Sequence, residues 1–213
     1  MNKLHRTAAL TSAAAVAAGL TLAAAPAEAA PPSRAGTTSL AEVLAADGHR
    51  FDHHGADFDI VDKAVTTVLG AKPDSAVAVL ADGKVRLTAF LPTDRAFRKL
   101  VGSLTGTWPK TEKATFDAVA AVADVDTLEA VLLYHVVPGA TLTAAKVLTS
   151  DGAELTTAQG GTVTVSVKGK KVTLGDLDPD AHDPMANPRQ LDINQGNRQV
   201  AHGISRVLRP IDL

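Results

Sequence analysis

Residues 87–97 read Leu-Thr-Ala-Phe-Leu-Pro-Thr-Asp-Arg-Ala-Phe, and the rest of the chain is organised around this stretch. The alternation from Leu87 to Leu91 predicts a strand, which Pro92 ends because it has no N–H to donate to a ladder. Thr93 is a favourable helix N-cap, and Asp94 stands where the positive end of a helix dipole favours a carboxylate. The stretch therefore predicts a strand that turns directly into an amphipathic core helix, and it contains no nucleophile beside a base.

Periodicity places the other elements on both sides of this stretch. Helices are expected over residues 40–47, 58–69, 95–104, 112–123 and 128–135, and strands over 76–80, 85–91, 154–158, 162–167, 171–174 and 204–211. Helices are grouped early and strands mostly late, which predicts an α+β domain without internal repeats.

The expected helix starts carry recognisable caps. Ser39 and Glu42 form a capping box, and Asp57, Thr111 and Asp126 stand at three further starts, in addition to Thr93. Asp82-Gly83 suits a type I′ turn, so residues 76–91 predict a β-hairpin. The three late strands alternate polar and apolar residues between Gly-containing turns, which predicts an antiparallel meander.

The first 29 residues have the pattern of a secretory signal peptide: a short basic start, an Ala-rich apolar run and a small-x-small cleavage site at 27–29. We expect residues 30–38 to be a flexible leader and residues 39–213 to form one domain. An uncleaved membrane anchor is disfavoured because alanine drives insertion weakly and no basic stop-transfer cluster follows. The mature chain is expected outside the cytoplasm, without stable membrane insertion.

Charge and composition narrow the class of partner. Removing residues 1–29 takes away Lys3, Arg6 and Glu28, which changes the net charge from −2 to −3. This balance gives no electrostatic case for binding nucleic acid. The chain has no cysteine, so packing alone must stabilise an exported domain. Aromatic residues are scarce, which argues against a stacking platform for sugars or bases.

Three blocks of sequence together resemble the fasciclin domain family: residues 88–97, residues 132–139 with their Tyr-His pair, and residues 192–210. The family's motif positions carry over to Thr88, Phe90, Pro92, Thr93, Asp94, Phe97 and His202. The third block departs from the family pattern, because its turn at 196–199 is one residue longer and Gly203 stands where an apolar residue is common. The resemblance covers residues 40–213.

The resemblance implies a β-wedge or sandwich of antiparallel strands with several helices packed on it. It also implies a secreted, single-domain, non-catalytic protein that adheres to or binds surface proteins or extracellular polysaccharides. No cofactor and no metal are expected, and we expect a monomer. Two alternatives stay open: an extracytoplasmic enzyme that uses His135 or His202, and a structural component of the cell envelope. The first predicts a His and a carboxylate in an open pocket, and the second predicts an exposed apolar patch.

The resemblance implies binding roles for Tyr134, His135, Asp192 and Ile193. For Tyr134 and His135 a structural role is favoured over binding. In that role a buried His135 hydrogen-bonds nearby backbone or a carboxylate and fixes the end of the helix. For Asp192 and Ile193 the alternatives are balanced: Asp192 is either an exposed recognition carboxylate or the cap of the turn at 194–195.

Three further patterns favour ordinary surface roles over ligand binding. Asp176, Asp178 and Asp180 have a calcium-loop spacing, but an EF-hand needs Gly at 181 and Glu at 187, where this chain has Ala and Asn. We expect a solvated loop there. The pair His53-His54 lacks a third well-spaced metal ligand. Lys168, Lys170 and Lys171 form a basic hairpin tip that could meet an acidic polysaccharide, although lysines at a strand edge more often prevent aggregation.

Overall fold

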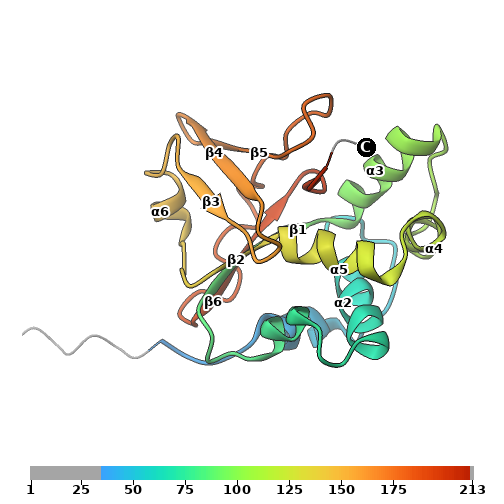
Figure 1. Ribbon diagram of the computed structural model, residues 1–213, viewed down its shortest axis with the longest axis horizontal. Helices are drawn as coiled ribbons and strands as arrows, with labels where there is room; N and C mark the ends of the chain where they lie inside the picture. Colours follow the sequence, from blue (N-terminus) through green and yellow to red (C-terminus); the bar gives the residue numbers. More distant parts are fainter. Residues whose placement is uncertain (1–34, 212–213) are drawn as a thin grey trace, which may run out of the picture. The chain divides into compact units, whose positions relative to one another are not determined.

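The computed structural model describes residues 35–211 (Figure 1), so the predicted signal peptide lies outside the described residues. One sheet has the order β2 (Val136–Pro138), β1 (Leu87–Pro92), β6 (Gln199–Ile204). A second sheet has the order β3 (Glu154–Thr156), β4 (Thr162–Lys168), β5 (Lys171–Gly175) and is antiparallel throughout. The predicted α+β class and the predicted meander are confirmed.

Helices fill the chain between the strands. They are α1 (Leu40–Leu44), α2 (Asp59–Ala71), α3 (Asp94–Thr105), α4 (Glu112–Val122), α5 (Val125–Tyr134) and α6 (Ala144–Val147), with 3-10 turns η1 (Ala45–Asp47) and η2 (Ala76–Ala81). Figure 1 shows α2 to α5 on one side of the β2–β1–β6 sheet and the β3–β4–β5 sheet on the other. Within residues 35–211 no helix combines the length and apolarity that crossing a membrane requires.

Strand β1 separates two apolar clusters, and all six of its residues are buried. Leu87, Ala89 and Leu91 point into a helical cluster formed with α1 to α5. Phe90 points the other way, into a sheet cluster that contains Val165 and other inward residues of β4 and β5. Successive residues of a strand face opposite sides, so the alternation read from the sequence assigns each residue to one cluster.

The partners of β1 differ from the predicted hairpin. β1 pairs antiparallel with β2 and parallel with β6, in register from Leu87 opposite Gln199 to Pro92 opposite Ile204. The strand predicted at 76–80 is the 3-10 turn η2, whose first turn is capped by the Ser75 hydroxyl. Gly83 does not adopt the positive φ of a type I′ turn. A Cβ there would lie 1.7 Å from the Thr37 carbonyl oxygen, so this glycine permits close backbone contact.

The last strand also begins earlier than predicted. The sequence suggested residues 204–211, whereas β6 is Gln199–Ile204 and the chain beyond it is irregular. Gly203 permits close packing, because a Cβ there would lie 2.8 Å from Cβ of Gln190. The turn before β6 binds the start of the domain: Asn197 Oδ1 accepts from the Thr38 N–H at 3.0 Å. The end of the expected leader is thereby held on the domain.

Of the five predicted caps, two are confirmed and two are wrong, and Thr93 stands at the expected cap position of α3 without a side-chain hydrogen bond. Ser39 and Glu42 form the capping box of α1, and Thr111 caps α4. Helix α5 begins at Val125, three residues earlier than predicted, with Asp124 as its cap, and Asp126 instead pairs with Lys72.

Helix α2 is not capped by Asp57 either. It begins at Asp59, and the Ile60 N–H donates to Asp94 Oδ1 at 2.9 Å. The carboxylate at the start of α3 therefore caps α2, a helix that lies beside it in space.

Candidate functional site

Tyr134 and His135 end α5 and are both buried. The Tyr134 hydroxyl donates to the Thr162 carbonyl at 2.7 Å, and burial raises its pKa to about 12. His135 Nδ1 donates to the Val131 carbonyl at 2.7 Å, and its Nε2 accepts from the Leu208 N–H at 2.9 Å. This geometry supports the structural alternative for His135. The role of the pair in binding a partner stays a prediction.

His202 is held in the same way on β6. Its Nε2 donates to the Leu142 carbonyl at 2.7 Å, and its Nδ1 accepts from the Asp192 N–H at 3.2 Å. Burial lowers the pKa of His202, and it lowers the pKa of His135 to about 4. Each ring is neutral and uses both nitrogens on backbone groups. Neither histidine therefore has a free nitrogen for the general-base role that the enzyme alternative requires.

Asp192 and Ile193 lie in the loop that precedes β6. Asp192 adopts a left-handed φ of 55°, and its Oδ1 accepts from the N–H of Ala144, the first residue of α6, at 2.7 Å. It therefore caps α6, which neither sequence-based alternative contained. The backbone of Ile193 exchanges two hydrogen bonds with Ala201. Both residues are half-buried, and their binding role stays a prediction.

The other motif residues are buried within the framework. Thr88 Oγ1 donates to the Ala140 carbonyl and accepts from the Leu142 N–H, at 2.9 and 2.8 Å. The rings of Phe90 and His202 lie 6.0 Å apart across the β1–β6 pair. These motif positions thus connect β1 to its neighbours.

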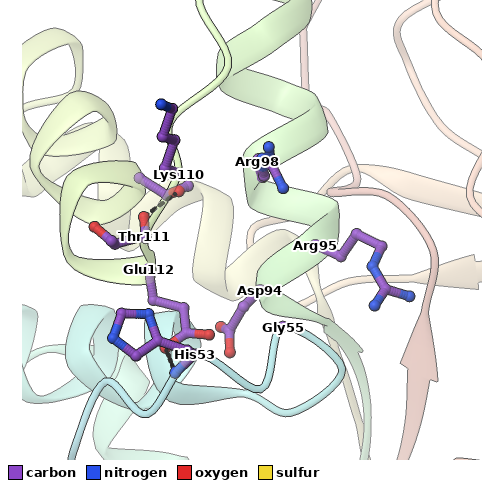
Figure 2. A pocket seen from close by; sticks show the side chains of 9 residues that line it. His53, Gly55, Asp94, Arg95, Arg98, Lys110, Thr111 and Glu112 are labelled. Carbon is purple, nitrogen blue, oxygen red and sulfur yellow. Dashed lines mark hydrogen bonds between the residues drawn. The ribbon is translucent and has the colours of Figure 1, made fainter.

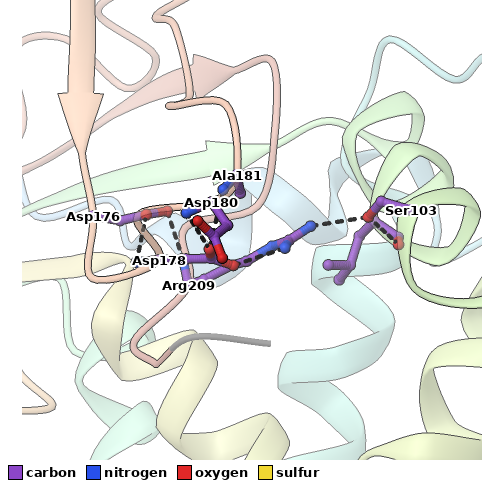
Figure 3. Close-up of polar contacts among 7 residues, drawn as sticks. Ser103, Asp176, Asp178, Asp180, Ala181 and Arg209 are labelled. Carbon is purple, nitrogen blue, oxygen red and sulfur yellow. Dashed lines mark hydrogen bonds and ion pairs between the residues drawn. The ribbon is translucent and has the colours of Figure 1, made fainter.

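The aspartate-rich loop is built around an arginine (Figure 3). Asp178 is 2% exposed, and its Oδ2 lies 2.8 Å from Arg209 Nη1. Asp176 Oδ2 accepts from the Arg209 N–H at 2.9 Å, and a second guanidinium nitrogen donates to Ser103. The expectation of a solvated loop is wrong for Asp178, because the Arg209 side chain supplies the positive charge that this buried carboxylate requires.

A pocket that sequence reasoning missed lies where α3 and α4 begin (Figure 2). Its volume is about 160 Å³. The loop at 53–57 joins the two helix starts: the His53 N–H donates to Glu112 Oε2 at 2.8 Å, and the Gly55 carbonyl accepts from the Arg95 N–H at 2.9 Å. Loop carbonyls therefore satisfy the first N–H groups of α3, for which Thr93 supplies no side-chain cap.

The inner wall of the pocket is acidic. Asp94 and Glu112 are 2% and 6% exposed, and their carboxylates point toward one another (Figure 2). With Asp57 they form a carboxylate cluster, whose ligand oxygens all lie within 4.8 Å of one another. Burial, followed by the contact with Asp57, raises the pKa of Asp94 to about 9. Asp94 is therefore protonated at neutral pH in the absence of a bound cation.

The outer edge of the pocket is basic. Arg95, Arg98 and Lys110 are exposed and line it; we call them the basic rim. Within residues 35–211 their side chains make no hydrogen bond or ion pair. Arg95 also faces Lys99, whose pKa is lowered by burial and then by Arg206 and Arg95. Unpaired cations on this face of α3 can bind an anionic group without first breaking an internal contact.

The sequence contains a partial signal for this pocket. Thr93-Asp94 and Thr111-Glu112 repeat one Thr-acid pair at two helix starts. The pattern indicates the local dipole role of each acid, but not that the two helix starts converge on one loop.

The three motif blocks lie together on one α+β framework, around β1, at the α5–β2 junction and along β6. A model of the fasciclin domain family matches residues 64–210, and the chain belongs to this family. The fold is similar to a solved fasciclin-domain pair from the insect cell adhesion molecule fasciclin I, with a TM-score of 0.55 and 15% identity. That match covers 81% of this chain and 51% of the other, so the chain spans about half the domain pair. No curated relative matches the chain.

Proposed function

We propose that the chain is an exported, non-catalytic binding domain that attaches to acidic polysaccharides or acidic proteins at the cell surface. Membership of the fasciclin family supports a general role in adhesion or binding. The observation that carries the choice of partner is the basic rim, in which Arg95, Arg98 and Lys110 surround a cavity and are unpaired within residues 35–211. Arginine and lysine in this arrangement favour carboxylate or sulfate groups.

The non-catalytic part of the proposal is supported by the histidines. His135 and His202 use both ring nitrogens on backbone partners. Asp94 has a raised pKa of about 9, as catalytic acids often do, but its Oδ2 is buried away from solvent.

A binding assay with immobilised acidic and neutral polysaccharides, and with surface-protein extract, tests the proposal. The rim variant Arg95→Gln/Arg98→Gln/Lys110→Gln is compared with the tip variant Lys168→Gln/Lys170→Gln/Lys171→Gln, which removes the same charge elsewhere. We expect saturable, salt-sensitive binding that falls about tenfold or more in the rim variant and is retained in the tip variant. Absence of saturable binding, or equal loss in both variants, would contradict the proposal.

A second candidate, a subunit of an envelope assembly, is favoured by one apolar groove. The groove between α3, α4 and α5 has a volume of about 130 Å³. Leu104 and Val122 line it and are 42% and 69% exposed. This candidate predicts self-association of the purified chain, measured by light scattering, that Val122→Lys removes. A monomer at all concentrations would leave the binding domain as the better proposal.

A further inference from the structure

Within residues 35–211 no lysine or arginine forms an ion pair with a member of the carboxylate cluster. Asp94 Oδ2 and Asp57 Oδ1 are buried and accept no hydrogen bond from an N–H or hydroxyl group within residues 35–211, and the two carboxyl groups contact one another. Buried polar atoms are almost always partnered, and an unpartnered buried carboxylate oxygen is costly. Because Asp94 is only 2% exposed and its carboxylate points toward Glu112, the unpartnered oxygen points into the cluster (Figure 2).

We propose that Asp57, Asp94 and Glu112 bind one calcium ion at the inner wall of the pocket. Their ligand oxygens lie within 4.8 Å of one another, a span that two Ca–O bonds of about 2.4 Å cover. Carboxylate oxygens are the ligands that a hard divalent cation prefers. This site departs from the sequence-based expectation that the chain binds no metal.

The surroundings leave room for the rest of a coordination shell. Calcium takes six to eight oxygen ligands, and the adjoining cavity of about 160 Å³ admits water to complete a set of three carboxylates. Magnesium needs shorter bonds and near-ideal octahedral geometry, which three ligands fixed on separate backbone elements match less well.

The neighbouring cations do not occupy the site. In Figure 2 the guanidinium of Arg95 and the amino group of Lys110 point away from the Asp94 carboxylate. The imidazole of His54 contacts Asp57 at its other oxygen, Oδ2, at 3.2 Å.

The inference does not depend on the proposed function, because it is measured on the purified protein without a partner. Thermal unfolding of chelator-treated protein is followed with and without 5 mM CaCl₂ at constant ionic strength. A site with a dissociation constant of about 0.1 to 1 mM, typical of extracellular calcium modules, would raise Tm by about 5 °C. Equimolar MgCl₂ is expected to give less than half that rise.

Two variants and one control identify the ligands. Asp94→Asn keeps the acceptor for Ile60, and Glu112→Gln keeps the acceptor for His53, so both retain the observed backbone contacts. Each is expected to abolish the calcium-induced rise in Tm. Asp117→Asn, an exposed carboxylate on the same helix α4, is expected to retain it.

A second measurement on the unaltered protein tests the site even if a variant fails to fold. Terbium binding to the unaltered protein is followed by luminescence excited through Trp108, the only tryptophan, which lies on the connection before α4. We expect calcium to displace terbium with a stoichiometry of one. The proposal is overturned if calcium leaves Tm unchanged, if both variants keep the full shift, or if calcium fails to displace terbium.

Discussion

The ring of His135 accepts a hydrogen bond from the backbone N–H of Leu208, 2.9 Å away and 73 residues further along the chain. At its other nitrogen the same ring donates to the Val131 carbonyl. A neutral imidazole satisfies both contacts, whereas an imidazolium has no lone pair left for Leu208. The join between α5 and the C-terminal segment therefore depends on His135 being uncharged.

Acidification is expected to weaken this join. The pKa of His135 is about 4 in the folded protein, against about 6.5 when exposed in the unfolded chain. Between these values only the unfolded chain binds the proton, so the free energy of unfolding rises with pH across this window. The contribution of His135 is about 3 kcal/mol, complete above pH 6.5 and lost as pH falls to 4. Urea unfolding measured from pH 4 to 7 checks it.

The matched variants for this pH effect are His135→Gln and His182→Gln. His182 is exposed, so its replacement should leave the pH dependence unchanged. His135→Gln should be less stable at pH 7 and should show a shallower slope between pH 4 and 6.5. Identical slopes in the two variants would show that another group is responsible.

Loss of the Arg209 guanidinium should destabilise the fold strongly. Its partner Asp178 is buried, so Arg209→Met leaves a buried charge without a counter-charge. We expect a loss of about 3–5 kcal/mol in the free energy of unfolding, measured by denaturant titration. Arg209→Lys keeps the positive charge but lacks the second guanidinium nitrogen that donates to Ser103. Its free energy of unfolding should fall by less than that of Arg209→Met. Equal losses would mean that packing, and not charge, dominates.

Gln199 should be one of the costliest polar residues to replace. Its Oε1 accepts from the Leu40 N–H, and its Nε2 donates to the carbonyls of Val79 and Asp82. Gln199→Ala leaves the buried Leu40 N–H unpaired, whereas the Val79 and Asp82 carbonyls still accept from the Asp82 and Val85 N–H groups, and it should cost about 2–3 kcal/mol. Hydrogen exchange should accelerate at the Leu40 amide. The exposed Gln195→Ala is the control and should change neither quantity.

Two helical glycines should respond differently to alanine. At Gly70 in α2 no atom lies within 4 Å of an added Cβ, so Gly70→Ala should stabilise the protein by about 0.5–1 kcal/mol. At Gly102 in α3 the added Cβ would lie 2.6 Å from the Trp108 ring. Gly102→Ala should displace the indole, shift its fluorescence to the red and gain no stability. An unshifted emission spectrum would contradict this packing.

Patterns that depend on nearest neighbours were predictable from the sequence. Ser39 with Glu42, and Thr111, cap the helices that follow them, because a cap acts within one turn. The meander of β3 to β5 was predictable for the same reason, since its strands pair with sequence neighbours. The alternation at Leu87–Leu91 correctly indicated a strand.

Contacts between distant segments were not predictable in this way. Asp94 caps α2 through Ile60, so the local role expected for Asp57 was wrong. The parallel pairing of β1 with β6 replaced the hairpin suggested by Asp82-Gly83, because glycine serves close approach as well as tight turns. The carboxylate cluster escaped detection for a similar reason. Its members come from a loop and two helix starts that only the folded chain brings together.

The position of β1 between the two clusters has a thermodynamic consequence. Leu91 and Phe90 are adjacent in the chain, yet each belongs to a different cluster. Because both clusters share β1, unfolding of one cluster removes the strand on which the other packs. The helices and the meander are therefore expected to unfold in a single cooperative transition. Calorimetric and van't Hoff enthalpies should then agree, as they do for proteins without a populated half-folded state.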